Sequence, residues 1–296
     1  MQDKANKCSA CLTFDFDSFS VWLHGFQVNS PTHMSKGEFG GRVGVPRILD
    51  LLSDYGIPAT FFVPGHTIDS WPGLVERIAG EGHEIGHHGY RHSTPVTLTR
   101  DEEKRELERG LEAILRVTGV EPAGYRSPAW DLSPNSLDLF REFGFQYDSS
   151  LMATDFEPYF CREGDVPHDD KGFEWGTETE LVEVPVSWSL DDFPYFEFLF
   201  HPTYLRGLAA PSRVLDMWAE DFDYMYSHVP GGVFNATFHP QVIGRGARMN
   251  MLEGLINHIR GYAGVEFKTV RQVVAEFKAQ HRPNESLAEP WGRAAE

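Results

Sequence analysis

The feature that most constrains the fold is an alternation of short apolar strands and helices along nearly the whole chain of 296 residues. Residues 11–17 and 59–63 are aromatic and β-branched runs typical of strands, whereas residues 45–55 and 100–118 carry the spacing and end signals of amphipathic helices. Such alternation is typical of a parallel sheet covered by helices. Because no linker or internal repeat divides the chain, we expect a single α/β domain over residues 1–296, with a frayed tail at 281–296.

The same signals place the other elements. Further strands are expected at residues 84–86, 123–130, 145–148, 181–188, 232–238 and 265–268, and further helices at 72–80, 135–143, 212–227, 250–262 and 270–280. Three stretches rich in aromatic residues fit neither pattern, at 18–42, 154–179 and 193–211. We expect the first to be a long loop that acts as a substrate lid, and the other two to be insertions or excursions.

Polar side chains capable of chemistry gather where the expected strands end. They are Asp15, Asp17, His66, His88, His92, Arg126, Asp148, Asp191 and His239. In a closed (β/α) barrel the carboxyl ends of the strands form one rim, which is the usual place of the active site. An open, doubly wound sheet would spread the same residues along a line. We therefore predict an irregular, TIM-like barrel of seven or eight strands with long aromatic loops.

Two histidines and two aspartates indicate a metal site on that rim. His88 and His92 are four residues apart, so both imidazoles can point at one spot if the segment is helical. Asp15 and Asp17 face the same side of a strand, where two like charges are costly unless a cation or proton offsets them. One carboxylate with two imidazoles matches a catalytic zinc site, which keeps positions open for water and substrate.

Such a site would supply all the parts of a hydrolase. A bound ion lowers the pKa of its water toward about 7, a second carboxylate can take the proton, and an imidazole opposite can protonate a leaving nitrogen. The candidates for these roles are Asp15, Asp17, His88, His92 and His239. Two other function classes stay open: a non-haem iron oxygenase, for which we would expect a β-sandwich instead, and an inactive binding protein.

Four motifs also resemble, in order, those of the NodB-type polysaccharide deacetylases (carbohydrate esterase 4-like). They are Thr-Phe-Asp-Phe-Asp at 13–17, His-Gly-Tyr-Arg-His at 88–92, Arg-Ser-Pro at 126–128 and Phe-His-Pro at 238–240. The resemblance extends from about residue 12 to the final helix and implies an irregular (β/α)7 barrel.

The resemblance also implies residue roles for hydrolysis of an amide by a metal-activated water. Asp17, His88 and His92 would bind a divalent metal, with zinc as the expected ion. Asp15 would be the general base, held in place by Arg126, and His239 the general acid. Asp148, at the next strand end, would orient His239.

The first motif departs from the family pattern, because Phe16 separates two aspartates that are usually adjacent. This spacing resembles a subgroup of cytoplasmic peptidoglycan-deacetylase-like enzymes, cyclic imide hydrolases and metal-independent allantoinases. The metal-free members lack the second histidine, so His92 implies a metal. The subgroup implies a homotetramer and an enclosed site for a small amide, with Trp22 and Trp130 in the pocket wall. The substrate stays open between an N-acetylated sugar and a cyclic imide.

The amino-acid composition argues against some classes of binding partner. A formal net charge of −18 argues against binding to nucleic acid or an anionic membrane. The first residues lack the apolar stretch of a signal peptide, and no apolar run is long enough to span a bilayer, so we expect a cytoplasmic protein. Other chemical candidates are interpreted as structural: His83 and His87 as structural or supporting groups, His66 as a supporting group or a loop cap, and Asp191 and Asp192 as loop caps. Cys8, Cys11 and Cys161 are too few for a disulfide framework, and Cys8 and Cys11 are interpreted as small residues that lead into the first strand.

Overall fold

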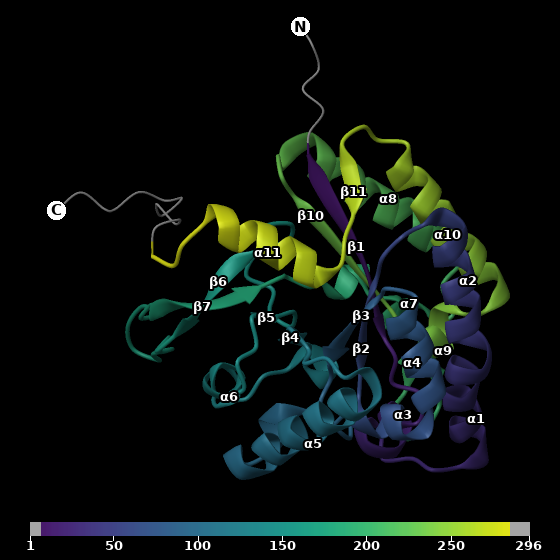
Figure 1. Cartoon of the computed structure of the whole chain (residues 1–296), viewed down its shortest axis with the longest axis horizontal. Helices are drawn as coiled ribbons and strands as arrows, with labels where there is room; N and C mark the ends of the chain where they lie inside the picture. Colours follow the sequence, from purple (N-terminus) through teal and green to yellow (C-terminus); the bar gives the residue numbers. More distant parts are fainter. Residues whose placement is uncertain (1–6, 285–296) are drawn as a thin grey trace, which may run out of the picture.

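Parallel strands form a curled sheet at the centre of the molecule (Figure 1). The structure is a computed structural model and describes residues 7–284. Seven strands follow one another in the order β10 (Val233–Phe238), β1 (Cys8–Asp15), β2 (Thr60–Val63), β3 (Glu84–His87), β4 (Gly124–Tyr125), β5 (Tyr147–Asp148) and β7 (Thr177–Glu183). All neighbouring pairs in this series are parallel. The predicted tail at 281–296 lies, from residue 285 on, outside the described residues.

The two ends of this series meet without a regular ladder. The Asn235 Nδ2 of β10 donates to the carbonyl oxygen of Pro185 at 2.9 Å, just beyond β7. An isolated parallel bridge joins Thr237 to Asp191 farther along the same seam. The sheet thus closes as an irregular barrel of seven parallel strands, which confirms the predicted fold class. Two further strands extend it: β11 (Val265–Phe267) pairs with β1, and β6 (Tyr159–Glu163) pairs antiparallel with β7.

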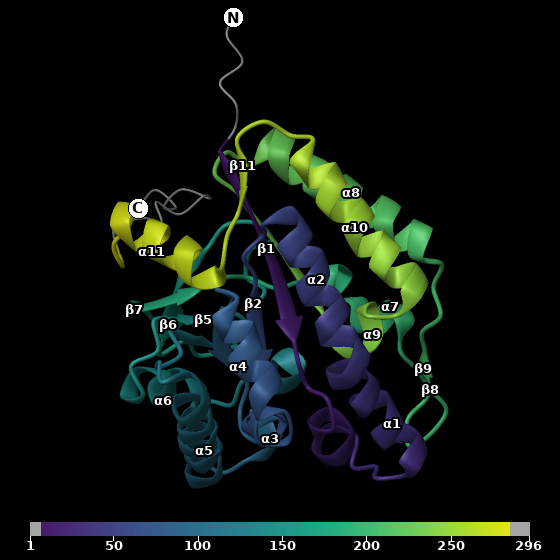
Figure 2. The same ribbon diagram turned by 45° about the vertical axis from the view of Figure 1, so that its right-hand side comes forward.

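Helices cover the barrel on its outside, and α8 and α10 run side by side along one flank (Figure 2). The helices are α1 (Pro31–Phe39), α2 (Val45–Tyr55), α3 (Gly65–Ser70), α4 (Pro72–Gly80), α5 (Arg100–Thr118), α6 (Ser136–Glu142), α7 (Asp192–Phe196), α8 (Pro211–His228), α9 (Pro240–Ile243), α10 (Gly246–Arg260) and α11 (Val270–Gln280). The predicted capping box is present, because the Thr99 side chain accepts from the Glu102 backbone while Glu102 accepts from Thr99.

The barrel interior is packed with side chains, and α11 closes its N-terminal end. Cys11, Phe62, Tyr147 and Val182 form a buried cluster with apolar residues of α11. The α11 backbone is tied to the strand starts, since the Val270 N–H donates to Thr60 Oγ1 at 2.9 Å. The barrel interior is therefore filled at this end, and in barrels of this kind the active site lies at the opposite rim.

The predicted long loop at 18–42 is wrong, because most of it is helical. A short turn, η1 (Val21–Gly25), is followed by α1 and by η2 (Gly40–Gly44), which runs directly into α2. Glycines in this stretch disfavour a helix by about 1 kcal/mol each when judged from propensity alone. Here they allow close packing: a Cβ on Gly44 would lie 2.2 Å from the Pro240 carbonyl oxygen. Tertiary contact thus overrides the local signal.

The other two irregular stretches contain short strands. Residues 154–179 include β6 and the start of β7, which form an antiparallel hairpin, and residues 193–211 include α7 and a small hairpin of β8 (Phe198–Leu199) and β9 (Leu205–Arg206). The strand predicted at 123–130 is cut to β4 alone. Pro128 follows it closely, and Ala129 and Trp130 are left-handed, with φ of 57° and 52°.

Candidate metal centre and active-site cavity

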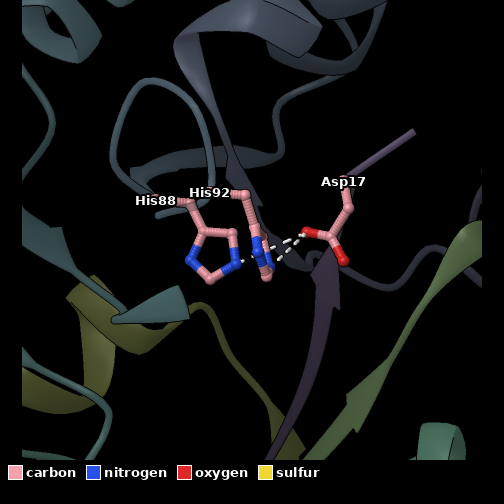
Figure 3. A group of neighbouring side chains, drawn as sticks. All are labelled: Asp17, His88 and His92. Carbon is pink, nitrogen blue, oxygen red and sulfur yellow. Dashed lines mark ion pairs between the residues drawn. The ribbon is translucent and has the colours of Figure 1, made fainter. Parts of the chain in front are cut away.

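Asp17, His88 and His92 point toward one another at the C-terminal rim of the barrel (Figure 3). Asp17 lies two residues beyond β1 and is completely buried. Its Oδ1 atom is 3.4 Å from His88 Nε2 and 3.6 Å from His92 Nε2. The structure therefore brings the three predicted ligands to one point from two separate strands.

The histidine pair is held by a loop rather than by the helix that the four-residue spacing allowed. β3 ends at His87, and both Gly89 and His92 have positive φ, of 69° and 59°. His88 Nδ1 lies 2.7 Å from the Arg126 carbonyl oxygen, so it donates to this acceptor and leaves Nε2 free to face Asp17. Two left-handed residues thus turn the chain so that both imidazoles converge.

The three side chains fit a divalent metal ion. Both carboxylate oxygens of Asp17 are buried without a hydrogen-bond partner, which is costly unless a cation meets them. Burial disfavours a charge on Asp17, but His92 and the other imidazoles outweigh it and lower the pKa to about 2. Burial lowers the pKa of His92 to about 4, so that the ring is neutral. Two ligand atoms on one tetrahedral ion are about 3.4 Å apart, close to the separations observed here.

Asp15 is held by a fully buried arginine. Arg126 Nη1 donates to Asp15 Oδ1 at 2.9 Å and to Thr13 Oγ1 at 2.8 Å. The guanidinium also donates to the Ser149 carbonyl and hydroxyl, at 3.0 and 2.9 Å, and lies over the Phe62 ring. With its donors used in this way, Arg126 fixes one oxygen of Asp15, which lines the cavity beside Asp17.

His239 faces Asp17 from the end of β10. Its Nε2 atom is 3.7 Å from Asp17 Oδ2, and its Nδ1 atom donates to Asp192 Oδ1 at 2.9 Å. The same oxygen accepts from the His239 backbone N–H at 3.0 Å. Burial alone would lower the pKa of His239, but the carboxylates of Asp191 and Asp192 raise it well above the usual value. The ring is thereby set up as an imidazolium whose free N–H faces the cavity.

The prediction that Asp148 orients His239 is wrong in this geometry. Asp148 ends β5, accepts a hydrogen bond from Ser150 Oγ at 2.8 Å and stands opposite Glu183 of β7. Asp192, interpreted from sequence as a loop cap, accepts the hydrogen bond from His239, and Asp191 Oδ1 lies 3.4 Å from the same Nδ1 atom. Asp191 does act as a cap, accepting from the Phe193 N–H at 2.9 Å. The signal for Asp192 was available, because it follows the expected sixth strand on the same rim.

A cavity of about 430 Å³ opens over these residues. Much of its wall is apolar, and the side chains are Val21, Phe26, Trp130, Trp188, Phe193 and Leu205. Trp130 lies in the wall as predicted, with its ring 4.4 Å from that of Trp188. The placement of Trp22 in the wall is wrong. Trp22 is completely buried behind Val21 and Phe26, because it packs into a separate apolar cluster with Leu199.

The remaining histidines of interest support the backbone. His87 is buried and its Nε2 donates to the Leu107 carbonyl oxygen at 2.9 Å, while its Nδ1 accepts from the Gly89 N–H. His66 pairs with the Ser20 hydroxyl at 3.0 Å.

Cys8, Cys11 and Cys161 are free and buried. None of the helices within residues 7–284 has the length and apolarity to cross a membrane.

Comparison with known proteins agrees with this geometry. The polysaccharide deacetylase family model matches residues 3–147. A peptidoglycan deacetylase from Helicobacter pylori is 36% identical over 274 residues, which cover 89% of this chain and 94% of that protein. A Mycobacterium smegmatis structure assigned to the polysaccharide deacetylases is 34% identical, with a TM-score of 0.81 over 95% of this chain and 93% of that one.

An allantoinase structure shares the fold at 21% identity, with a TM-score of 0.76 over 95% of this chain and 93% of that one. The same barrel thus occurs in enzymes described by different substrates. Taken with the rim of aspartates and histidines, the extended identity to the H. pylori protein shows that this chain belongs to the polysaccharide deacetylase family, whose members are hydrolases of carbon–nitrogen bonds.

Proposed function

We propose that this chain is a metal-dependent amide hydrolase in which Asp17, His88 and His92 hold a divalent ion, with zinc as the expected metal. The observation that carries this proposal is the buried Asp17 carboxylate, whose two oxygens have no donor and face imidazole nitrogens. When bound, such an ion polarises a carbonyl group and lowers the pKa of water toward neutrality.

Two residues around this centre carry out the proton transfers, one as the base and one as the acid. Asp15 accepts the proton of the attacking water, and Arg126 keeps its carboxylate oriented. His239 donates a proton from Nε2 to the leaving nitrogen. Asp192 accepts from Nδ1 and thereby fixes the ring and stabilises its positive charge. Asp15 as base and His239 as acid thus act beside one metal centre.

Deacetylation of an N-acetylated sugar is the preferred reaction. The H. pylori relative that covers most of this chain is named a peptidoglycan deacetylase. A cavity of about 430 Å³ is in the range of small-molecule sites and is faced by aromatic rings on which a sugar can stack. Hydrolysis of a cyclic imide is the second candidate, because the enclosed, aromatic wall also suits a small flat ring.

One assay separates these reactions. Metal-loaded protein is incubated with N-acetylglucosamine oligomers and, separately, with succinimide and hydantoin. Release of acetate without ring opening supports the deacetylase and removes the imidase, whereas ring opening alone supports the imidase. If neither occurs while the Asp17→Ala control binds metal as well as wild type does, the proposed site is wrong.

Assembly and location stay predictions from the sequence. We propose a homotetramer in the cytoplasm, following the subgroup that the motifs resemble. Light scattering coupled to size-exclusion chromatography tests the tetramer directly, and a monomer at micromolar concentration would contradict it.

A further inference from the structure

One cationic side chain besides the histidines lines the cavity over the metal centre. It is Arg206, on the small strand β9. Within residues 7–284 its guanidinium has neither an ion-pair partner nor a hydrogen-bond partner. Acidic side chains outnumber basic ones by 44 to 26 in the chain.

Apart from Asp17 at the metal centre, the acidic groups in the same wall have partners of their own. Asp15 is paired with Arg126, and Asp191 accepts from the Phe193 N–H. Glu197, the acidic residue nearest in the chain to Arg206, forms a buried ion pair with Lys36. The charge of Arg206 is therefore left available to a molecule in the cavity.

The backbone that carries Arg206 is held from several sides. Arg206 stands opposite Phe198 in the β8–β9 hairpin, which lies beside α1 (Figure 2). Lys36 of α1 donates to the Phe198 carbonyl oxygen at 2.9 Å, and the Gly207 N–H donates to the Glu197 carbonyl oxygen at 3.1 Å. Leu205 packs against the buried cluster of Trp22. These contacts brace the backbone of Arg206, whose exposed side chain borders both this cavity and a second hollow beside Tyr204 and Leu208.

A planar guanidinium offers two parallel N–H donors that match the oxygens of a carboxylate. We propose that Arg206 binds a carboxylate of the substrate while the scissile amide lies at the metal centre. This proposal rests on the proposed hydrolase function and narrows it. The substrate class is an N-acyl or cyclic amide that carries a carboxylate, and the apolar wall between the two charged ends contacts its uncharged part.

Two matched pairs of compounds test this. N-Acetylmuramic acid carries a lactyl carboxylate that N-acetylglucosamine lacks, and dihydroorotate carries a ring carboxylate that dihydrouracil lacks. Binding of each to the zinc-loaded protein is measured by calorimetry, and hydrolysis is followed separately. The variants are Arg206→Ala, Arg206→Lys and the control Arg213→Ala. Arg213 is an exposed arginine on α8 that pairs with Asp216 and lies outside the cavity wall.

We expect wild type and Arg213→Ala to bind the carboxylate member of at least one pair about tenfold more tightly than its neutral partner. Arg206→Ala should remove this preference, and Arg206→Lys should keep part of it because lysine retains the charge without the fork. Equal binding within both pairs, failure to bind either carboxylate compound, or a preference that survives Arg206→Ala would overturn the proposal. Absence of hydrolysis with the preference intact would count against the hydrolase function alone.

Discussion

Two carboxylates at opposite ends of the barrel, Glu84 half-buried and Asp17 completely buried, show how differently one fold treats the same chemical group. Glu84 begins β3 at the N-terminal end and accepts hydrogen bonds from Tyr147 Oη at 2.9 Å, Thr60 Oγ1 at 2.8 Å and the Arg271 N–H at 3.0 Å. Asp17 at the other end has no donor, and its nearest polar neighbours are imidazole nitrogens at 3.4 to 3.7 Å.

The number of hydrogen-bond donors around each carboxylate distinguishes a structural role from a functional one. Where a carboxylate serves the fold, as at Glu84, the fold surrounds it with donors, because an acceptor that loses both water and donors costs about 1–3 kcal/mol. Where the oxygens are left open on the active rim of a barrel, something outside the chain is expected to complete them. Substitution of Asp17 should therefore affect metal binding and activity, whereas substitution of Glu84 should affect stability.

Asp17→Ala should lower amide hydrolysis by about a thousandfold or more, because it removes the anionic metal ligand. Metal content per chain should fall at the same time, as measured by plasma mass spectrometry on the purified protein. Glu84→Gln is the matched control, since it keeps the shape of the half-buried acid and lies at the opposite end of the barrel from the rim. Full activity in Asp17→Ala, or equal metal loss in both variants, would contradict the assignment of Asp17 as a metal ligand and Glu84 as a structural residue.

Glu84→Ala should reduce the free energy of unfolding by about 3 kcal/mol, since three donors lose their acceptor and a cavity is left. Urea denaturation measures the effect. Metal bound per folded chain should equal that of wild type. A stability within about 0.5 kcal/mol of wild type would show that Glu84 is not the structural counterpart of Asp17.

Asp192→Asn should lower kcat by about a hundredfold while metal content stays normal, because the acid histidine loses one of the two carboxylates, Asp191 and Asp192, that support its protonation. With that charge gone the pKa of His239 falls, so the basic limb of the rate profile moves to lower pH. Asp148→Asn is the control, as it makes no contact with His239. Equal kcat losses in the two variants would restore Asp148 as an alternative partner.

The buried pair of Asp148 and Glu183 is intermediate between Glu84 and Asp17 in its hydrogen bonding. Asp148 Oδ1 accepts from Ser150, whereas Asp148 Oδ2 has no hydrogen-bond partner. Burial raises the pKa of Asp148 to about 6, above its value in the unfolded chain. The native state therefore keeps a proton that the unfolded state gives up near pH 4, so the stabilisation from this group is lost as pH rises from about 4 to about 6. Asp148→Asn should flatten this part of the stability curve by about 3 kcal/mol, measured by urea denaturation at each pH. An unchanged slope would contradict the assignment.

Elements with strong local signals could be predicted from the sequence. α2, α5 and α11 match the expected residue ranges, since their caps and apolar spacing lie within the segments themselves. The rim residues Asp15, Asp17 and His239 could be placed because strand ends are visible in the pattern.

Features set by long-range contact could not be predicted. The helices in residues 18–44 depend on glycines packed against α9 and Trp71, a contact that no local pattern shows. The burial of Trp22 depends on the β8–β9 hairpin, whose Leu199 comes from a distant part of the chain. The choice between Asp148 and Asp192 depended on where the barrel seam brings α7, which the order of strands alone does not define.

Calorimetric titration of Zn²⁺ into metal-stripped protein tests the central claim most directly, with wild type and Asp17→Ala compared at the same pH. We predict one ion bound per wild-type chain, accompanied by a rise in thermal stability, and binding weakened by at least about a hundredfold in Asp17→Ala. Absence of binding to wild type, or the same affinity in both proteins, would contradict the account of Asp17 as an open carboxylate that a metal ion completes.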